Sequence, residues 1–170
     1  MVLLYCVSLM EKTIGVIGIG NPLRYDDAIG IILLDFLKDH GTDFHPNVSF
    51  VDAGTAGMNV LHVISEFDIV LIIDAVQMGK APGSWNFFSY GDVESQKEKE
   101  HISTHISDIF QVIELAKRIQ KKPEKIYIFG IEPADLSIGQ GLSKQVKDNL
   151  STLQEMVKEK LSWMIDSLLS

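Results

Sequence analysis

The sequence contains a single cysteine, Cys6, among 170 residues. One cysteine cannot form an internal disulfide, and thiolate metal sites usually use about two to four cysteines. Proteins without disulfides are typical of a reducing compartment, so we expect a cytoplasmic protein.

Basic residues are in the minority, and long apolar runs are missing. Lys and Arg total 15 against 23 Asp and Glu, which gives a formal net charge of −8. A nucleic-acid backbone is bound through many basic contacts, so this balance argues against nucleic acid as a partner. No stretch reaches the roughly 18 apolar residues that span a bilayer. Residues 1–10 are apolar but lack the flanking basic residues and cleavage pattern of a signal peptide, so we expect no membrane partner.

The composition is that of a folded domain. Apolar residues make up 46% of the chain and charged residues 22%, which provides a core and argues against global disorder. A length of 170 residues is typical of one domain. We therefore expect residues 1–170 to form a single domain.

Segments of strand and helix type alternate along the chain. Apolar runs predict strands at residues 13–19, 48–51, 68–76, 84–89 and 125–131, with residues 84–89 antiparallel at an edge. Helical patterns predict helices between them, one opening at Asp26 and one running from Ser143 to the end. The apolar stripe of that last helix is expected to be core, with a dimer seam as the alternative, and we expect a monomer. The alternation predicts an α/β fold, a three-layer α/β/α sandwich with a mostly parallel twisted sheet of about five strands.

Acidic residues follow the predicted strands at the points where the strands end. Ligands of open parallel sheets bind outside the carboxyl ends of the strands, where the connecting loops gather. The sequence places five carboxylates there: Asp26, Asp27, Asp52, Asp74 and Glu132. Like charges in a cleft raise one another's pKa unless a cation or a proton relieves them. We therefore expect this edge to recruit a metal ion, a proton or a basic peptide.

These acids differ in how well an ordinary structural role explains them. One of Asp26 and Asp27 fits a helix N-cap, which leaves the other available for function. Asp52 precedes a glycine-rich turn and fits a turn-stabilising role. Glu132 fits a surface loop. Asp74 lies in a predicted buried strand, where an unpaired carboxylate costs on the order of several kcal/mol, so its position favours a functional role.

Histidines add a candidate metal ligand. His101 and His105 precede a predicted helix in a polar loop, and His105 is the better placed of the two to reach the carboxyl edge. Two carboxylates and one imidazole suit zinc, nickel, manganese or iron, with coordination positions left for a substrate. These residue types alone do not rank the metals.

A nucleotide site is the competing interpretation of the glycines in the first predicted strand. Gly18 and Gly20 begin a G-x-G-x-x-G pattern, but its third glycine would fall at Leu23. Asp26 and Asp27 at the start of the next helix would repel a pyrophosphate. The pattern therefore argues against a dinucleotide, and a nucleotide-binding regulatory module remains only an alternative.

Several motifs occur together in a specific order. Residues 18–30 (GIGNPLRYDDAIG) match the pattern G-x-G-N-x-L-x-x-D-[DE]-x-x-G. The next motif is DAGTAG at residues 52–57. It is followed by a D-A…G…P-G pattern within residues 73–83. His105 after Thr104, residues 130–133 (GIEP) and residues 141–143 (GLS) complete the series. In this order the motifs resemble those of the hydrogenase maturation proteases, the endopeptidases that process nickel-iron hydrogenase large subunits.

The resemblance implies a function and a set of site residues. Asp27, Asp74 and His105 correspond to the family's metal-contacting and catalytic residues. The implied reaction removes the C-terminal extension of a hydrogenase large-subunit precursor after nickel insertion, with the nickel carried by the substrate rather than bound permanently. A nickel-binding maturation chaperone without cleavage is the alternative from another class.

The resemblance leaves the mechanism open between two routes. In one, nickel held by the trio polarises the scissile carbonyl or a water molecule. In the other, a carboxylate acts as general base on water. Asp27 stands where some members have Glu, and Ala53 replaces a glycine of the second motif.

Overall fold

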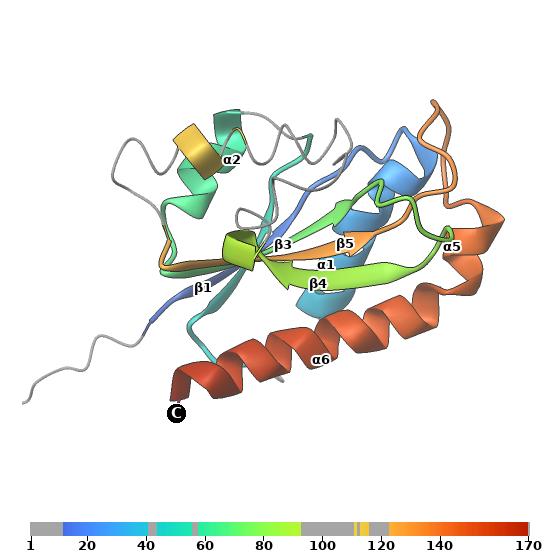
Figure 1. Cartoon of the computed structure of the whole chain (residues 1–170). Helices are drawn as coiled ribbons and strands as arrows, with labels where there is room; N and C mark the ends of the chain where they lie inside the picture. The colour runs from blue at the N-terminus through green and yellow to red at the C-terminus, as the bar shows by residue number, and fades with distance from the viewer. Residues whose placement is uncertain are drawn as a thin grey trace, which may run out of the picture.

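A computed structural model of the chain describes residues 12–40, 44–55, 58–92, 111, 113–115 and 123–169. Five strands form one sheet in the order β2-β1-β3-β5-β4 (Figure 1). Their bounds are β1 Ile14–Gly18, β2 Val48–Asp52, β3 Ile69–Ala75, β4 Trp85–Ser89 and β5 Lys125–Ile131. All neighbours pair in parallel except β4, which is antiparallel to β5 at the edge. The expected mostly parallel sheet with an antiparallel edge strand is confirmed.

Helices cover both faces of the sheet. The helical elements include the 3-10 turn η1 Tyr25–Ala28 and the helices α1 Ile29–Asp39, α2 Met58–Ile64, α5 Lys144–Asp148 and α6 Leu150–Leu169. One buried cluster joins α1 and α6 to one face, and a second joins α2 to the other. Figure 1 shows α2 and α6 on opposite sides of the strands. The three-layer α/β/α arrangement follows, and no described helix is long and apolar enough to cross a membrane.

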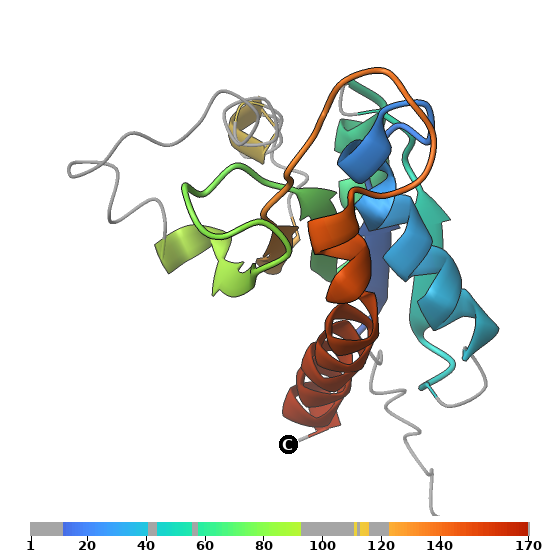
Figure 2. The same cartoon turned by 90° about the vertical axis from the view of Figure 1, so that its right-hand side faces the viewer.

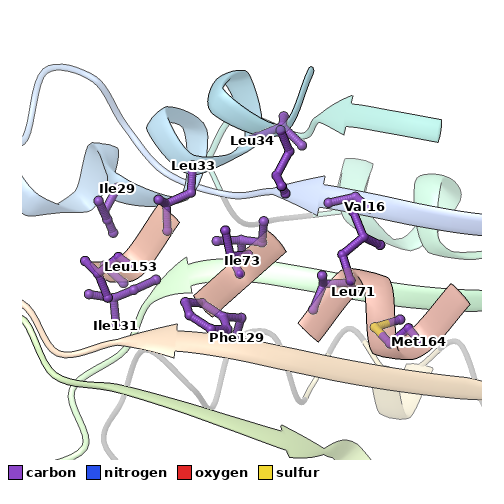
Figure 3. Packing of buried hydrophobic residues seen from close by; sticks show 14 of the residues in the cluster. Val16, Ile29, Leu33, Leu34, Leu71, Ile73, Phe129, Ile131, Leu153 and Met164 are labelled. Carbon is purple, nitrogen blue, oxygen red and sulfur yellow. The ribbon is translucent and has the colours of Figure 1, made fainter. Parts of the chain in front are cut away.

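The central strand β3 divides its side chains between the two clusters. All seven of its residues are buried, as expected for a strand covered on both faces. Leu71 and Ile73 point into the α1/α6 cluster, where Figure 3 shows Ile73 beside Phe129. Val70 and Ile72 point into the α2 cluster. Because side chains alternate along a strand, Asp74 lies on the α2 face.

The predicted C-terminal helix is divided at Asn149, which corrects the expectation of one continuous helix. The Nδ2 group of Asn149 donates to the carbonyl oxygen of Gln145, at 2.9 Å. That carbonyl would otherwise accept the Asn149 backbone N–H, which bonds to Val146 instead, at 3.2 Å. Side-chain amides compete for helical carbonyls in this way and so end α5.

The apolar stripe of α5 and α6 is core, as predicted. Its buried members belong to the α1/α6 cluster: Val146, Leu153, Val157, Leu161 and Met164. Figure 3 shows Leu153 and Met164 among the strand side chains. The stripe is therefore covered by the protein's own sheet.

The start of α1 is packed directly on the ends of β1 and β3. A Cβ atom at Gly30 would lie 2.1 Å from the Ile19 carbonyl oxygen and 2.4 Å from the Ile73 carbonyl oxygen. The backbone N–H of Ile19 bonds to the Ile73 oxygen at 2.9 Å, which ties the two strand ends together. From β1 the chain continues to β2, which pairs with one edge of β1, whereas β3 pairs with the other edge. The direction of the chain across the sheet therefore reverses between β1 and β3. Asp27 and Asp74 thus lie at the switch point of the sheet, where ligands of such folds bind.

We predict that Gly30→Ala lowers the free energy of unfolding by about 3 kcal/mol or more, the upper end of the range for overpacking. The added methyl group meets two backbone oxygens that cannot move without breaking the strand ends. Urea unfolding measures the change. Gly91→Ala is the control, because its Cβ would meet nothing closer than Ser89 Oγ at 3.9 Å. Equal stability of the two variants would contradict the close approach of α1.

Candidate active site

The five acidic residues expected at the carboxyl edge fall into three groups. Asp26 and Glu132 are buried and bound by backbone amides, Asp52 is exposed, and Asp27 and Asp74 interact with each other. Figure 2 looks onto this edge, with η1 and the loops that follow β3 and β5 on the side facing the viewer. The five acids therefore do not form one repelling cluster, and only Asp27 and Asp74 fit that description.

Asp26 is a structural carboxylate that binds the loop after β5. Its side chain is fully buried. Oδ2 accepts the backbone N–H groups of Ala134 at 2.8 Å and Asp135 at 3.0 Å, and Oδ1 accepts that of Ser143 at 2.7 Å. The expected N-cap role is wrong for both Asp26 and Asp27, because neither η1 nor α1 has a side-chain cap. Asp26 lies inside η1, and its carboxylate binds the loop after β5 instead.

The backbones of the same two loops are also bonded to each other. The N–H of Gly139 donates to Leu23 at 2.9 Å, and the N–H of Tyr25 donates back to Gly139 at 3.1 Å. The Tyr25 ring occupies the space beside Gly139, where a Cβ would lie 2.1 Å from the ring atom Cε2. The loop that carries Asp27 is thus fixed against the loop after β5.

Glu132 is not the surface-loop acid that we expected. Its side chain is 7% exposed, and Oε2 accepts the backbone N–H groups of Met78 at 2.6 Å and Lys80 at 3.1 Å. A glutamate directly after a buried strand was the available signal. The partners lie 52 and 54 residues away in the sequence, so no local pattern indicated them.

Asp52 has the turn-stabilising role expected for it. Its side chain is exposed, and Oδ1 accepts the backbone N–H of Gly54 at 2.8 Å. Gly54 has a φ of +60°, in the left-handed region that favours glycine. Asp52 therefore holds its own turn and makes no described contact with the other acids.

Asp74 is the buried acid whose charge is compensated only in part. It ends the buried strand β3, is 7% exposed, and lies opposite Gly130 in the pairing with β5. Burial raises the pKa of the Asp74 carboxyl well above its ordinary value of 3.8, and the negative charge of Asp27 raises it further. The backbone N–H of Ala75 opposes these effects only in part. The charge of Asp27 thus lies near enough to act on the Asp74 carboxyl.

The third expected site residue, His105, lies outside the described residues, as does His101. Tyr90 and Ile113, described residues on either side of them in the sequence, pack in the cluster on the α2 face. Within the described part of the chain, no three His, Cys, Asp or Glu side chains form a group that could hold a metal ion.

Comparison with known proteins identifies the family. The family model described as hydrogenase maturation protease matches residues 34–160. This chain belongs to the hydrogenase maturation protease family. The matched range contains Asp74 and His105, whereas Asp27 lies before it.

Individual relatives are similar over most of this chain. The hydrogenase expression/formation protein HupD of Thiocapsa roseopersicina is 28% identical over 153 residues, which cover 89% of this chain and 69% of the relative. The hydrogenase 2 maturation protease of Escherichia coli K12 is 29% identical over 143 residues, which cover 84% of this chain and 86% of the relative. The solved structure of the hydrogenase maturating endopeptidase HybD from E. coli has a TM-score of 0.73 and 27% identity, and the match covers 89% of this chain and 93% of that one.

Membership of the family also gives the activity class. Hydrogenase maturation proteases are peptidases that process the C-terminus of the hydrogenase large subunit, and this chain is such an endopeptidase. The fold, the family and the enzyme class expected from the motifs are therefore confirmed. The non-cleaving chaperone and the nucleotide-binding module are correspondingly disfavoured.

We predict that Asp26→Asn lowers the free energy of unfolding by about 2 to 4 kcal/mol, the scale for leaving buried donors of a charge-assisted network unpaired. Both oxygens of Asp26 accept backbone N–H groups, and an asparagine would turn its own NH₂ group toward one of those donors. Thermal unfolding measures the loss. Asp148→Asn is the control, since Asp148 is exposed and pairs with Lys144 on the same helix. A loss no larger than in the control would refute the structural role.

We also predict that Asp74→Asn stabilises the protein at neutral pH. A carboxyl with a raised pKa binds its proton more tightly in the folded state, so the wild type loses stability as pH rises from about 3.8 through the raised native pKa. Asparagine cannot ionise and escapes that loss. We expect a gain of about 1 to 3 kcal/mol at pH 7 that disappears near pH 3, the scale of a buried uncompensated polar group. Unfolding curves across this pH range test it, and a gain independent of pH would contradict it.

Proposed function

We propose that Asp27, Asp74 and His105 form the active site of this endopeptidase and hold the nickel ion of its substrate. The substrate is a nickel-loaded precursor of a hydrogenase large subunit, whose C-terminal extension is removed. The observation that supports this proposal best is the buried carboxyl of Asp74 beside the charge of Asp27, at the switch point of the sheet. Strongly perturbed carboxyls in such a position are candidates for function.

The chemistry of these residues fits a divalent cation. Two carboxylates and one imidazole are ligands that nickel accepts, and they leave coordination positions for groups of the substrate. A cation would also relieve the unfavourable proximity of the Asp27 and Asp74 charges. In this proposal the ion arrives with the precursor and leaves with the processed subunit, so the enzyme needs no permanent metal.

The third ligand is supported by the placement of its neighbours in the sequence. Tyr90 and Ile113 lie on either side of His105 and both pack on the α2 face. Asp74 lies on that same face by the alternation of β3. His101 lies in the same stretch, so the packing supports a histidine from this segment, and the position of His105 after Thr104 in the motif series is what selects it.

The proposed mechanism depends on positioning. The trio grips the nickel of the precursor, which brings the scissile peptide bond to a fixed place beside the site. The ion then polarises the carbonyl or a water molecule, or one of the carboxylates accepts a proton from that water. Asp74 must lose its proton to bind the ion, so binding becomes tighter as pH rises through its raised pKa. No serine or cysteine nucleophile is required.

We further propose that the protein acts as a cytoplasmic monomer on a protein partner. The apolar stripe of α5 and α6, the main candidate for a dimer seam, is buried against its own sheet. The single cysteine agrees with a reducing compartment. The net charge of −8 agrees with a protein partner rather than nucleic acid.

We predict that Asp27→Asn, Asp74→Asn and His105→Ala each abolish cleavage of the nickel-loaded precursor while the protein stays folded. Each change removes a charged or imidazole ligand from the proposed site, and we expect a rate reduction of at least about a hundredfold, the scale for a lost positioning group. Mass spectrometry of the precursor, with and without nickel, measures the cleavage. Asp35→Asn is the matched control, because Asp35 is an exposed acid that pairs with Lys38 on the outer side of α1.

Three results of this assay would count against the proposal. Wild-type protein that binds the loaded precursor but leaves its C-terminus intact would favour a chaperone. Cleavage of the nickel-free precursor at the same rate would remove the role of the ion. Full activity of any of the three variants would remove that residue from the site.

A further inference from the structure

The loop between β3 and β4, residues 76–84, is organised around the buried carboxylate of Glu132. Oε2 of Glu132 accepts the N–H groups of both Met78 and Lys80. Gly79 lies between them and has a φ of +70°. A Cβ atom added to Gly79 would meet no atom within 4 Å. A residue in the left-handed region turns the N–H groups on either side of it toward one point and so makes an anion-binding nest. Here the anion is a side chain of the protein itself.

Backbone bonds hold the same loop at both ends. The N–H of Val76 donates to the carbonyl oxygen of Ile131 at 2.7 Å. At the other end, the N–H of Gly83 donates to the Glu132 carbonyl oxygen at 2.8 Å, and the N–H of Glu132 donates to Ser84 at 2.9 Å. Only the middle of the loop, around Met78 and Lys80, depends on the Glu132 side chain.

The middle of the loop lies beside Asp74. Gly130 is the direct partner of Asp74 in the pairing of β3 with β5. A Cβ on Gly130 would lie 3.1 Å from Cβ of Val76 and 3.7 Å from Sδ of Met78. The sulfur of Met78 therefore lies in van der Waals range of the position opposite Asp74, and Val76 is packed closely against it. The amide that Glu132 binds most closely belongs to this same methionine.

We propose that Glu132 is a positioning residue for Asp74, because it fixes the loop that places Met78 over Gly130 and thereby shapes the wall of the site beside the Asp74 carboxyl. This role rests on the proposed function of Asp74 in precursor cleavage. Glu132 contacts neither the substrate nor the ion and acts only through the loop.

The bonding pattern predicts which substitutions preserve this role. Both N–H groups bind the same oxygen, Oε2, so one carbonyl oxygen in that place satisfies both of them. Glu132→Gln supplies such an oxygen without a charge and should keep the loop in place. Glu132→Ala supplies none. Asp26 differs, because it uses both oxygens and asparagine cannot replace it.

Amide hydrogen exchange of the protein alone tests the effect on the loop. We expect the Met78 and Lys80 amides to exchange about tenfold faster or more in Glu132→Ala than in the wild type, and at nearly wild-type rates in Glu132→Gln. The amides of Ile72 and Ile128 in the neighbouring strands should not change, which excludes global destabilisation. Unchanged exchange at Met78 and Lys80 in Glu132→Ala would overturn the proposal.

Steady-state cleavage of the nickel-loaded precursor tests the effect on Asp74. We expect Glu132→Ala to lower kcat by about ten- to a hundredfold with KM within about threefold of the wild type, as for a displaced catalytic geometry. Glu132→Gln should restore kcat. A wild-type kcat in Glu132→Ala would overturn the positioning role, whereas absence of cleavage by the wild type would overturn the proposed function instead.

A second variant covers the case in which Glu132→Ala does not fold. Gly79→Ala strains the nest at its φ of +70° without a steric clash and leaves Glu132 intact. We expect the same faster exchange at Met78 and Lys80 and the same lower kcat. Gly141→Ala is the matched control, because Gly141 has a φ of +87° and a Cβ there would also meet no atom within 4 Å. Gly141 lies in another loop, so this variant should leave amide exchange at Met78 unchanged. Wild-type exchange at Met78 and Lys80 in Gly79→Ala would overturn the proposal.

Discussion

The cost of burying carboxylates shapes the carboxyl edge of this sheet. A buried carboxylate is tolerated when N–H donors or a cation compensate its charge. Asp26 and Glu132 have such donors in backbone amides, and Asp52 stays in solvent. For Asp74 the backbone N–H of Ala75 offsets the burial only in part, and Asp27 adds a second negative charge nearby. The unfavourable electrostatics of the edge are therefore concentrated at one pair of residues, and the other acids stabilise the structure around that pair.

The two compensated acids have parallel roles in the architecture. Asp26 fixes the loop after β5 against η1, which carries Asp27, and Glu132 fixes the loop after β3, which lies beside Asp74. Each accepts backbone N–H groups from a segment that is distant in the sequence. A functional pair needs such a supporting shell, because loose loops would not hold two side chains in a reactive geometry. The close packing of Gly30 on the ends of β1 and β3 holds the start of α1, which directly follows η1 and Asp27, against the strand that carries Asp74.

Much of this arrangement could be predicted from the sequence, because it depends on local patterns. Continuous apolar runs indicated the strands, and the alternation with helices indicated the layers. The isolated acid in the run of β3 indicated Asp74. The roles of Asp26 and Glu132 could not be predicted, since their partners are backbone amides 52 to 117 residues away in the chain. No residue type marks such amides. The break at Asn149 was missed for a related reason, because a single side-chain bond overrides a continuing apolar stripe.

A site of this kind is suited to an ion that the substrate brings. In the proposed function, the ligand set reaches electrostatic balance only when a precursor with its nickel is present. A nickel-free precursor would leave the Asp27 and Asp74 charges uncompensated, and sites that leave buried polar groups unpaired discriminate strongly against the wrong ligand. The same repulsion that costs stability in the free enzyme then becomes selectivity for the loaded precursor. In this proposal, the repulsion between the Asp27 and Asp74 charges explains two things. It causes the energetic penalty at Asp74, and it makes cleavage follow nickel insertion.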